Sequence, residues 1–153
     1  MILWIASDHA GFALKEELKK TNKLAGQNIE WKDLGPSDES STDYPLHAQK
    51  LTSEIKAHKQ GADLLGPCGV LVCGSGVGVS IAANRVKGIR AVLAASQEVA
   101  KLSRQHNASN VLCLGSRLTA SDLAKEILKT WLATPFEGGR HEKRVQLIDE
   151  GNE

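Results

Sequence analysis

The sequence predicts one α/β domain over residues 1–153, built on a five-stranded parallel sheet. Two observations predict it. Short apolar runs alternate with longer stretches of helical period, as in repeated βαβ units. Several of the runs are also apolar on both faces, as strands buried between two layers of helices must be. A chain of 153 residues suits one such domain and buries roughly two-thirds of its unfolded surface.

Each expected strand has its own signature. The run "VLVC" and the later run "VLCL" are apolar throughout, which is typical of central strands. The second strand instead alternates Ile29 and Trp31 with polar residues and closes on Gly35. In chain order we expect strands at 2–6, 28–35, 70–73, 89–94 and 110–115.

The helices follow from apolar spacing and from their starts. Phe12, Leu14 and Leu18 fall on one side of the first helical stretch, and Ser121 with Asp122 suits the start of the last. Residues 36–45 have the composition of a loop. Residues 59–69 exceed the two to six residues usual between helix and strand, so they resemble an insertion. Helices are expected at 12–21, 46–59, 79–86, 96–105 and 121–133.

Composition excludes several classes of protein. The 19 basic and 18 acidic side chains nearly balance, which argues against a nucleic-acid or membrane surface. The apolar start is too short for a signal peptide, and no window approaches the roughly 20 apolar residues of a membrane span. Cys68, Cys73 and Cys113 form neither a disulfide framework nor a zinc-ligand spacing. We therefore expect a reducing, cytoplasmic setting.

Ligands of such sheets bind at the carboxyl ends of the strands, which draws attention to "VLVCGSGVGVSIAANR" at 70–85. Its glycines stand at 74, 76 and 78. The dinucleotide fingerprint opens on the first strand and needs an acid about 20 residues on, and Walker A needs Gly-Lys-Ser/Thr. Neither pattern is met, so a nucleotide cradle is disfavoured.

Successive amides in this loop form a nest for negative charge, whether a phosphate or an oxyanion formed during reaction. The nest comprises Gly74, Ser75, Gly76, Val77 and Gly78. The same field favours a thiolate at Cys73, which could act as a base. The alternative is that Cys73 is a small core hydrophobe and the glycines only turn the chain. Cys113 is assigned to the core, and Cys68 is structural or incidental.

Two further pairs of residues stand at the expected edge. Asp8 and His9 follow the first strand, where Asp8 could instead cap the next helix. His106 and Asn107 close a helix, where histidine is ordinary because its charge suits the helix dipole.

Four further residues could contact an anion or cover a ligand. Arg140 and Arg144 lie four apart and would share a helix face as a phosphate clamp, unless they pair with Glu137 or Glu142. Arg117 follows the last strand. Tyr44 lies in a polar loop, where it covers a ligand or is merely exposed. His47 and His58 are expected at the surface.

Taken together, several blocks resemble the type B ribose-5-phosphate isomerases, a family with relatives that act on six-carbon sugar phosphates. The blocks run in order from about residue 2 to about residue 148. They are "SDHAG", "TDYP", "CGSGVGVSIAANR", "GIRAVL", "SRQHNASNVLCLGSR" and "EGGRHEKRV". The resemblance implies a Rossmann-like three-layer α/β/α sandwich. It also implies interconversion of ribose 5-phosphate and ribulose 5-phosphate in the non-oxidative pentose phosphate pathway, without metal or other cofactor, through a cis-enediolate.

The resemblance assigns roles to the candidates. Cys73 becomes the base, with Ser75 beside the reacting end and the loop amides on the enediolate oxygen. Some members use a glutamate six positions further on, which is Val79 here, so Cys73 remains the base. The other assignments are Asp8 for hydroxyl protons, His106 for ring opening, Asn107 and Tyr44 for the sugar, and His9, Arg117, Arg140 and Arg144 for the phosphate.

The resemblance also implies a homodimer with a site shared between its chains. A metal-assisted route would need clustered carboxylates and histidines, and the sequence indicates no such cluster. The alternatives are an isomerase of allose or galactose 6-phosphate and, more remotely, a non-catalytic module that binds phosphate or a nucleotide.

Overall fold

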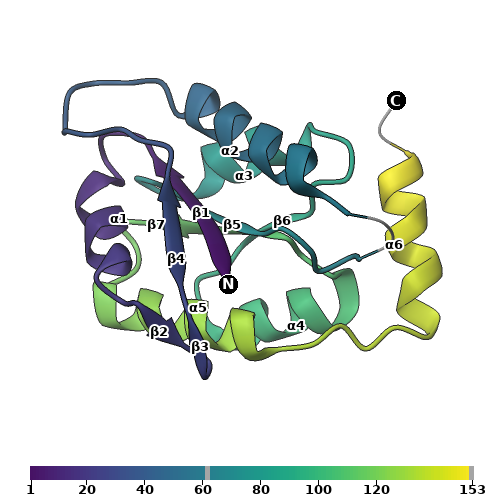
Figure 1. The fold of residues 1–153 in the computed structure, drawn as a ribbon. Coiled ribbons are helices and arrows are strands. Elements are labelled where there is room, and N and C mark those ends of the chain that lie inside the picture. The colour runs from purple at the N-terminus through teal and green to yellow at the C-terminus, as the bar shows by residue number, and fades with distance from the viewer. Residues whose placement is uncertain (61–62, 152–153) are drawn as a thin grey trace.

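A five-stranded parallel sheet organises the computed structural model, which describes residues 1–60 and 63–151 (Figure 1). The strand order is β4-β1-β5-β7-β6, and each neighbouring pair is parallel. The strands are β1 (Ile2–Ser7), β4 (Glu30–Asp33), β5 (Gly69–Cys73), β6 (Ala91–Leu93) and β7 (Val111–Gly115). The predicted α/β sheet is confirmed.

Helices cover both faces of this sheet, which completes the three predicted layers. One face carries α2 (Tyr44–His58) and α3 (Val77–Asn84). The other carries α1 (Phe12–Lys19), α4 (Gln97–Asn107) and α5 (Ser121–Ala133). Figure 1 shows the last helix, α6 (Arg140–Glu150), standing beside the sheet, where it packs against α4.

Alternation along the central strands divides the interior into two cores. In β5, Val70 and Val72 pack with α1 and α5, whereas Leu71 and Cys73 pack with α2 and α3. Every residue of β5 and β7 is buried, because helices shield both faces. This register turns Cys73, the last residue of β5, toward the α2–α3 side.

The predicted strand at 28–35 is wrong in its extent. Residues before β4 form a separate antiparallel hairpin of β2 (Lys23–Leu24) and β3 (Gln27–Asn28). The turn uses Ala25 and Gly26, both with positive φ, at 49° and 77°. A two-residue turn with positive φ at both positions suits the twist of a hairpin. The alternation of Ile29 and Trp31 masked this break.

The connection expected to be an insertion contains no helix or strand at residues 59–60 and 63–68, and residues 61–62 lie outside the described part of the chain. The helix containing Arg140 and Arg144 runs on to Glu150. It is anchored by Arg90, whose guanidinium binds both carboxylate oxygens of Asp149 at 2.8 and 2.9 Å. None of the helices in the described residues is both long and apolar enough to cross a membrane.

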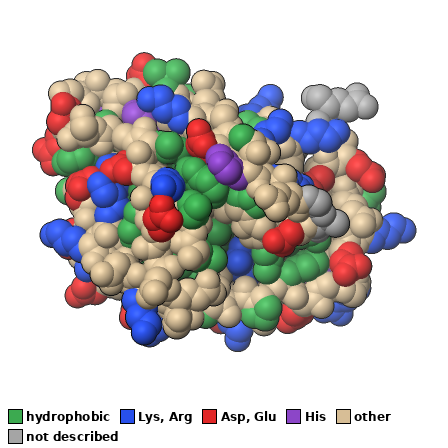
Figure 2. All heavy atoms as spheres, in the orientation of Figure 1, with side chains coloured by type: hydrophobic (Ala, Val, Ile, Leu, Met, Phe, Trp, Pro, Cys, Tyr) green, Lys and Arg blue, Asp and Glu red, His purple; other side chains and the backbone are tan. Residues whose placement is uncertain are grey.

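Charge is mixed over the surface that Figure 2 shows. Lysine and arginine side chains are interspersed with acidic ones on this face, and small apolar areas lie between them. A face of this kind offers no continuous basic stripe for a phosphate backbone.

Candidate active site

The loop between β5 and α3 wraps its backbone around the sulfur of Cys73. The amide of Gly76 donates to Cys73 Sγ across 3.1 Å, and the amide of Val77 donates to Ser75 Oγ at 3.2 Å. Gly76 has a φ of 77°, which favours glycine, and it serves as the N-cap of α3. The bent loop therefore places a backbone N–H on the sulfur at the start of α3.

Two side chains lie directly against this loop. A Cβ on Gly78 would come within 2.7 Å of Tyr44 Cζ, so the tyrosine ring rests on the bare backbone there. A Cβ on Gly74 would come within 3.0 Å of Arg117 Nη1, and the Arg117 amide donates to the Gly74 carbonyl at 2.9 Å. These glycines therefore permit a phenol and a guanidinium to approach the Cys73 loop.

Asp8 and His9 reach the same place from the end of β1. Asp8 is buried, and its Oδ1 accepts from the Gly11 amide at 2.9 Å, just before α1. Asp8 thus holds the turn before α1, whereas the N-cap of that helix is Gly11 and has no side-chain cap, so the capping alternative for Asp8 is wrong. His9 Nδ1 lies 3.2 Å from the amide of Thr42, in the loop before α2. Nδ1 is also 3.2 Å from the Thr42 carbonyl oxygen, and Nε2 makes no hydrogen bond within the described residues.

These groups surround one hollow of about 370 Å³ at the carboxyl edge of the sheet, which we call the strand-end hollow. Its volume is within the range of small-molecule sites. It is lined by Asp8, His9, Ala10, Tyr44, Cys73, Gly74, Ser75, Gly78, Arg117 and Leu118. The predicted site residues from four separate segments thus meet.

The remaining predicted residues gather elsewhere. His106 and Asn107 end α4, while Arg140 and Arg144 begin α6, and none of them lines the strand-end hollow. Both arginines are exposed. Within the described residues neither guanidinium pairs with Glu137 or Glu142, so the alternative of a local ion pair is not met.

At this second location the structure forms a group of side chains that sequence analysis missed, which we call the His–Glu–His cluster: His106, Glu137 and His141. The two imidazoles are stacked, with centroids 4.4 Å apart and planes 13° from parallel. Glu137 Oε2 lies 3.9 Å from His106 Nε2 and 3.6 Å from His141 Nε2. The four-residue spacing of Glu137 and His141 could have indicated that these two side chains lie close together. No local sequence pattern indicates that they also approach His106 at the end of α4.

The prediction that His47 lies at the surface is wrong. It is buried, and its Nε2 lies 2.9 Å from Thr42 Oγ1. Burial and the nearby Lys50 lower the pKa of His47, although Asp8 opposes them. Ala48, Leu51 and Ile55 mark the buried stripe of α2, and His47 belongs to that stripe. Through Thr42 it supports the loop that holds His9.

The other two cysteines are core residues. Cys113 is fully buried in β7, and burial raises its pKa. Burial raises the pKa of Cys68 to about 11. Neither thiol lines the strand-end hollow, whereas Cys73 does.

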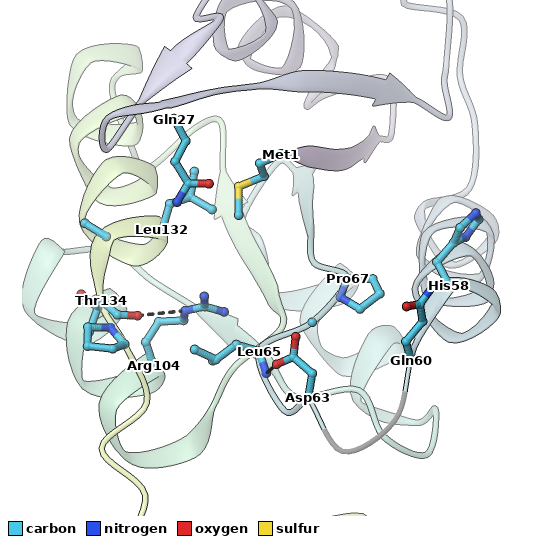
Figure 3. A pocket seen from close by; sticks show the side chains of 13 residues that line it. Met1, Gln27, His58, Gln60, Asp63, Leu65, Pro67, Arg104, Leu132 and Thr134 are labelled. Carbon is cyan, nitrogen blue, oxygen red and sulfur yellow. Dashed lines mark hydrogen bonds between the residues drawn. The ribbon is translucent and has the colours of Figure 1, made fainter.

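A larger hollow of about 520 Å³ lies near the starts of β1 and β5 and contains none of the predicted site residues (Figure 3). Arg104 projects into it beside Asp63 and Leu65. The Arg104 guanidinium donates to the carbonyls of Ser109 and Thr134, at 2.7 and 3.4 Å. Its role is therefore to tie α4 to the segment after α5.

The fold is that of a doubly wound α/β protein, and a hollow of small-molecule size that contains a thiol lies at the carboxyl edge of its sheet. A sequence profile described as ribose/galactose isomerase matches residues 3–148. The chain belongs to the ribose/galactose isomerase family. This agrees with the family resemblance stated from the sequence motifs.

Individual relatives agree along nearly the whole chain. Ribose-5-phosphate isomerase B of Escherichia coli is 45% identical over 141 residues, covering 92% of this chain and 89% of its own. The crystal structure of a ribose 5-phosphate isomerase from Thermotoga maritima gives a TM-score of 0.87 at 47% identity, with 97% of each chain covered. The Mycoplasma genitalium ribose-5-phosphate isomerase B, solved with bound ribulose-5-phosphate, gives 0.87 at 39% identity, with 98% and 95% covered.

Proposed function

We propose that this protein interconverts ribose 5-phosphate and ribulose 5-phosphate, and that residues 1–153 act as one catalytic domain in the cytoplasm. The observation that carries the proposal is the Gly76 amide 3.1 Å from Cys73 Sγ, in a hollow that also holds Arg117 and His9. A base, an oxyanion nest and an anchor for phosphate are the parts that an enediolate isomerisation requires. The bound ribulose-5-phosphate of the Mycoplasma genitalium relative supports the same ligand class.

The chemistry proceeds by proton transfer alone. The Cys73 thiolate takes the proton from C2 of the open-chain aldose. The electron pair forms the C1–C2 double bond of a cis-enediolate, and the C1 oxygen becomes negative under the amides of residues 74–78. Asp8 carries the hydroxyl proton from O2 to O1, with Ser75 beside it, and the thiol returns its proton to C1. Atoms and charge balance without an oxidant, a metal or a cofactor.

Phosphate binding begins with His9 and Arg117. Nδ1 of His9 lies 3.2 Å from both the amide nitrogen and the carbonyl oxygen of Thr42, so either tautomer finds a partner there and Nε2 is the nitrogen left for a ligand. With a proton on Nε2, His9 offers one donor to a phosphate in the strand-end hollow, and the Arg117 guanidinium offers another. Tyr44, resting on Gly78, lies beside the same hollow and would line the sugar.

The separated residues support a homodimer. His106, Asn107, Arg140 and Arg144 are absent from the strand-end hollow, yet their types suit ring opening, sugar binding and phosphate binding. A second copy of the chain would bring them to this hollow. Val77 and Ile81 on α3, and Leu93 at the edge strand, are exposed large apolar side chains that such an interface would cover.

The deciding experiment measures turnover of both pentose phosphates by EDTA-treated protein, with allose and galactose 6-phosphates run in parallel. Turnover of the pentose pair that survives EDTA supports the proposal. Activity confined to a six-carbon sugar phosphate would contradict the proposed substrate but would be consistent with the proposed mechanism. Lack of turnover, together with thermal stabilisation by a nucleotide, would overturn the proposal in favour of a binding module, since a ligand at 100 Kd adds about 2.7 kcal/mol.

A further inference from the structure

The His–Glu–His cluster has the composition and spacing of a metal site. One ligand atom from each of His106, Glu137 and His141 can be chosen so that all three lie within 4.8 Å of one another. Two imidazole nitrogens and a carboxylate oxygen form a donor set that zinc accepts in proteins, with a fourth position left to water. Nothing in the proposed isomerisation uses Glu137 or His141.

The separations are close to those of a bound ion. Zinc bonds of about 2.0–2.2 Å in tetrahedral geometry place neighbouring ligand atoms roughly 3.3–3.5 Å apart. The observed separations from Glu137 Oε2 are 3.6 Å to His141 Nε2 and 3.9 Å to His106 Nε2. The two Glu137 separations would shorten by a few tenths of an ångström on binding. The stacked imidazoles, whose ligand atoms lie within 4.8 Å, would also rotate apart so that their lone pairs converge on the ion.

A second observation points to a missing ligand. His141 is buried, and its Nε2 makes no hydrogen bond to any described residue. Buried polar atoms normally have a partner, and each exception needs an explanation. This nitrogen is on the side of the ring that approaches Glu137, whose own side chain is half exposed. An ion entering from solvent would therefore reach the unpartnered nitrogen past Glu137.

The backbone already holds the three residues together. The Glu137 amide donates to the Gln105 carbonyl at 3.1 Å, immediately before His106 in the chain. The His141 amide donates to the Gly138 carbonyl at 3.1 Å in the turn that opens α6. Because these bonds fix the end of α4 against the start of α6, little main-chain ordering is left for a metal to impose.

We propose that His106, Glu137 and His141 form an inhibitory site for a divalent transition-metal ion, Zn²⁺ above all. The consequence for activity rests on the proposed function, in which His106 opens the furanose ring. An imidazole nitrogen bonded to Zn²⁺ can neither accept nor donate the proton that ring opening needs. The metal therefore removes His106 from the reaction without occupying the Cys73 loop.

This site predicts inhibition that depends on the direction of reaction. The aldose enters as a closed ring and needs His106. The ketose cannot close a five-membered ring, because its 5-oxygen is esterified, so it enters open. Zn²⁺ at the cluster slows turnover of ribose 5-phosphate much more than turnover of ribulose 5-phosphate, whereas Zn²⁺ on the Cys73 thiolate would block both.

The chain contains a matched control for the pairing of histidine and glutamate. His58 and Glu54 on α2 are also one helical turn apart, and His58 Nδ1 lies 3.6 Å from Glu54 Oε2. No third histidine, cysteine or carboxylate joins them among the described residues. The pair reproduces the Glu137–His141 separation without the third ligand that His106 supplies.

The test is calorimetric titration of the reduced protein with ZnCl₂, for the native sequence and for C73S, H141N, E137Q and E54Q. We expect one Zn²⁺ per chain in the native protein, C73S and E54Q. We expect H141N and E137Q each to weaken Kd at least about tenfold, since even outer-shell changes have effects of this size. Thermal melts check that both variants fold, and the conservative E137Q keeps the measurement usable if H141N does not.

Binding lost in C73S but kept in H141N would assign the ion to the thiol and overturn the proposal, as would failure to bind Zn²⁺ in the native protein at 1:1 stoichiometry. Because calorimetry needs no substrate, a protein inactive on pentose phosphates can still bind Zn²⁺ at the cluster. Failure of the proposed function is thus separable from failure of the metal site.

Discussion

The strand-end hollow and the His–Glu–His cluster are built in different ways. The hollow is formed mainly by main-chain atoms. Backbone amides, closely packed glycines and the ends of β1, β5 and β7 hold the side chains of Cys73, His9 and Arg117 in place. The cluster is formed by side chains at the end of α4 and the start of α6. His106 and Glu137 are partly exposed, and Nε2 of His141 has no hydrogen-bond partner among the described residues. A rigid backbone nest suits charge that develops in a transition state. Exposed side chains at helix ends are suited to completing a site on a second copy of the chain.

The largest effect should follow from removing the base in the hollow. We expect Cys73→Ala to lower kcat more than about 100-fold in both directions, the scale of general acid–base groups. Cys68→Ala is the matched control, because that thiol is buried away from the hollow. Steady-state kinetics of the folded variants provide the measurement. A rate for Cys73→Ala within a few-fold of the native enzyme would return Cys73 to the core-hydrophobe interpretation.

The separation of the two regions leads to a complementation experiment. Cys73→Ala lacks the base and His106→Asn lacks the ring-opening group, so each variant alone should turn over ribose 5-phosphate slowly. Suppose that each site combines the hollow of one chain with the α4–α6 end of the other. Random mixing then gives about half mixed dimers, each with one intact site of two, so about a quarter of the native sites are restored. The measurement is activity after unfolding and refolding the variants together. Activity equal to the average of the separate variants would mean that each site uses one chain only.

A smaller effect is expected at the contact between Tyr44 and the loop. Gly78→Ala places a methyl group 2.7 Å from Tyr44 Cζ, so the ring must move away. We expect kcat/KM to fall by about tenfold, because a small misplacement of a positioning group is costly. Tyr44→Phe separates packing from hydrogen bonding, since it keeps the ring and removes the hydroxyl. An unchanged kcat/KM in Gly78→Ala would show that the ring position is unimportant.

The difference between the regions also explains what the sequence could predict. Cys73 and its loop form one contiguous motif at the end of a strand, so the general rule for parallel sheets locates them. His9, Tyr44 and Arg117 join them because their strands and loops end at that same edge. His106, Glu137 and His141 meet through the packing of α6 on α4, a long-range contact that no local sequence pattern indicates. The ion pair of buried Arg90 with the partly exposed Asp149 also holds α6. The β2–β3 hairpin was not predicted for a local reason. Its turn needs a positive φ at Ala25, and alanine seldom adopts such a conformation.

The smallest expected effect concerns His47, and its readout is stability. Burial lowers the pKa of His47 below its ordinary value of 6.5. Between the two pKa values the unfolded chain binds more protons than the folded one, so the free energy of unfolding falls as the pH drops below about 6.5. His47→Gln should flatten this decline, and the exposed His58→Gln should not.

Urea unfolding at pH 7.5, 6.5 and 5.5 measures this dependence for the native protein and both variants. An equal slope in His47→Gln and in the native protein would contradict the role of buried His47. His47 bonds to Thr42, which holds His9, so the variant should also raise KM for the phosphate substrate at pH 7.5. A rise in KM without a fall in kcat separates this positioning role from a general loss of folded protein.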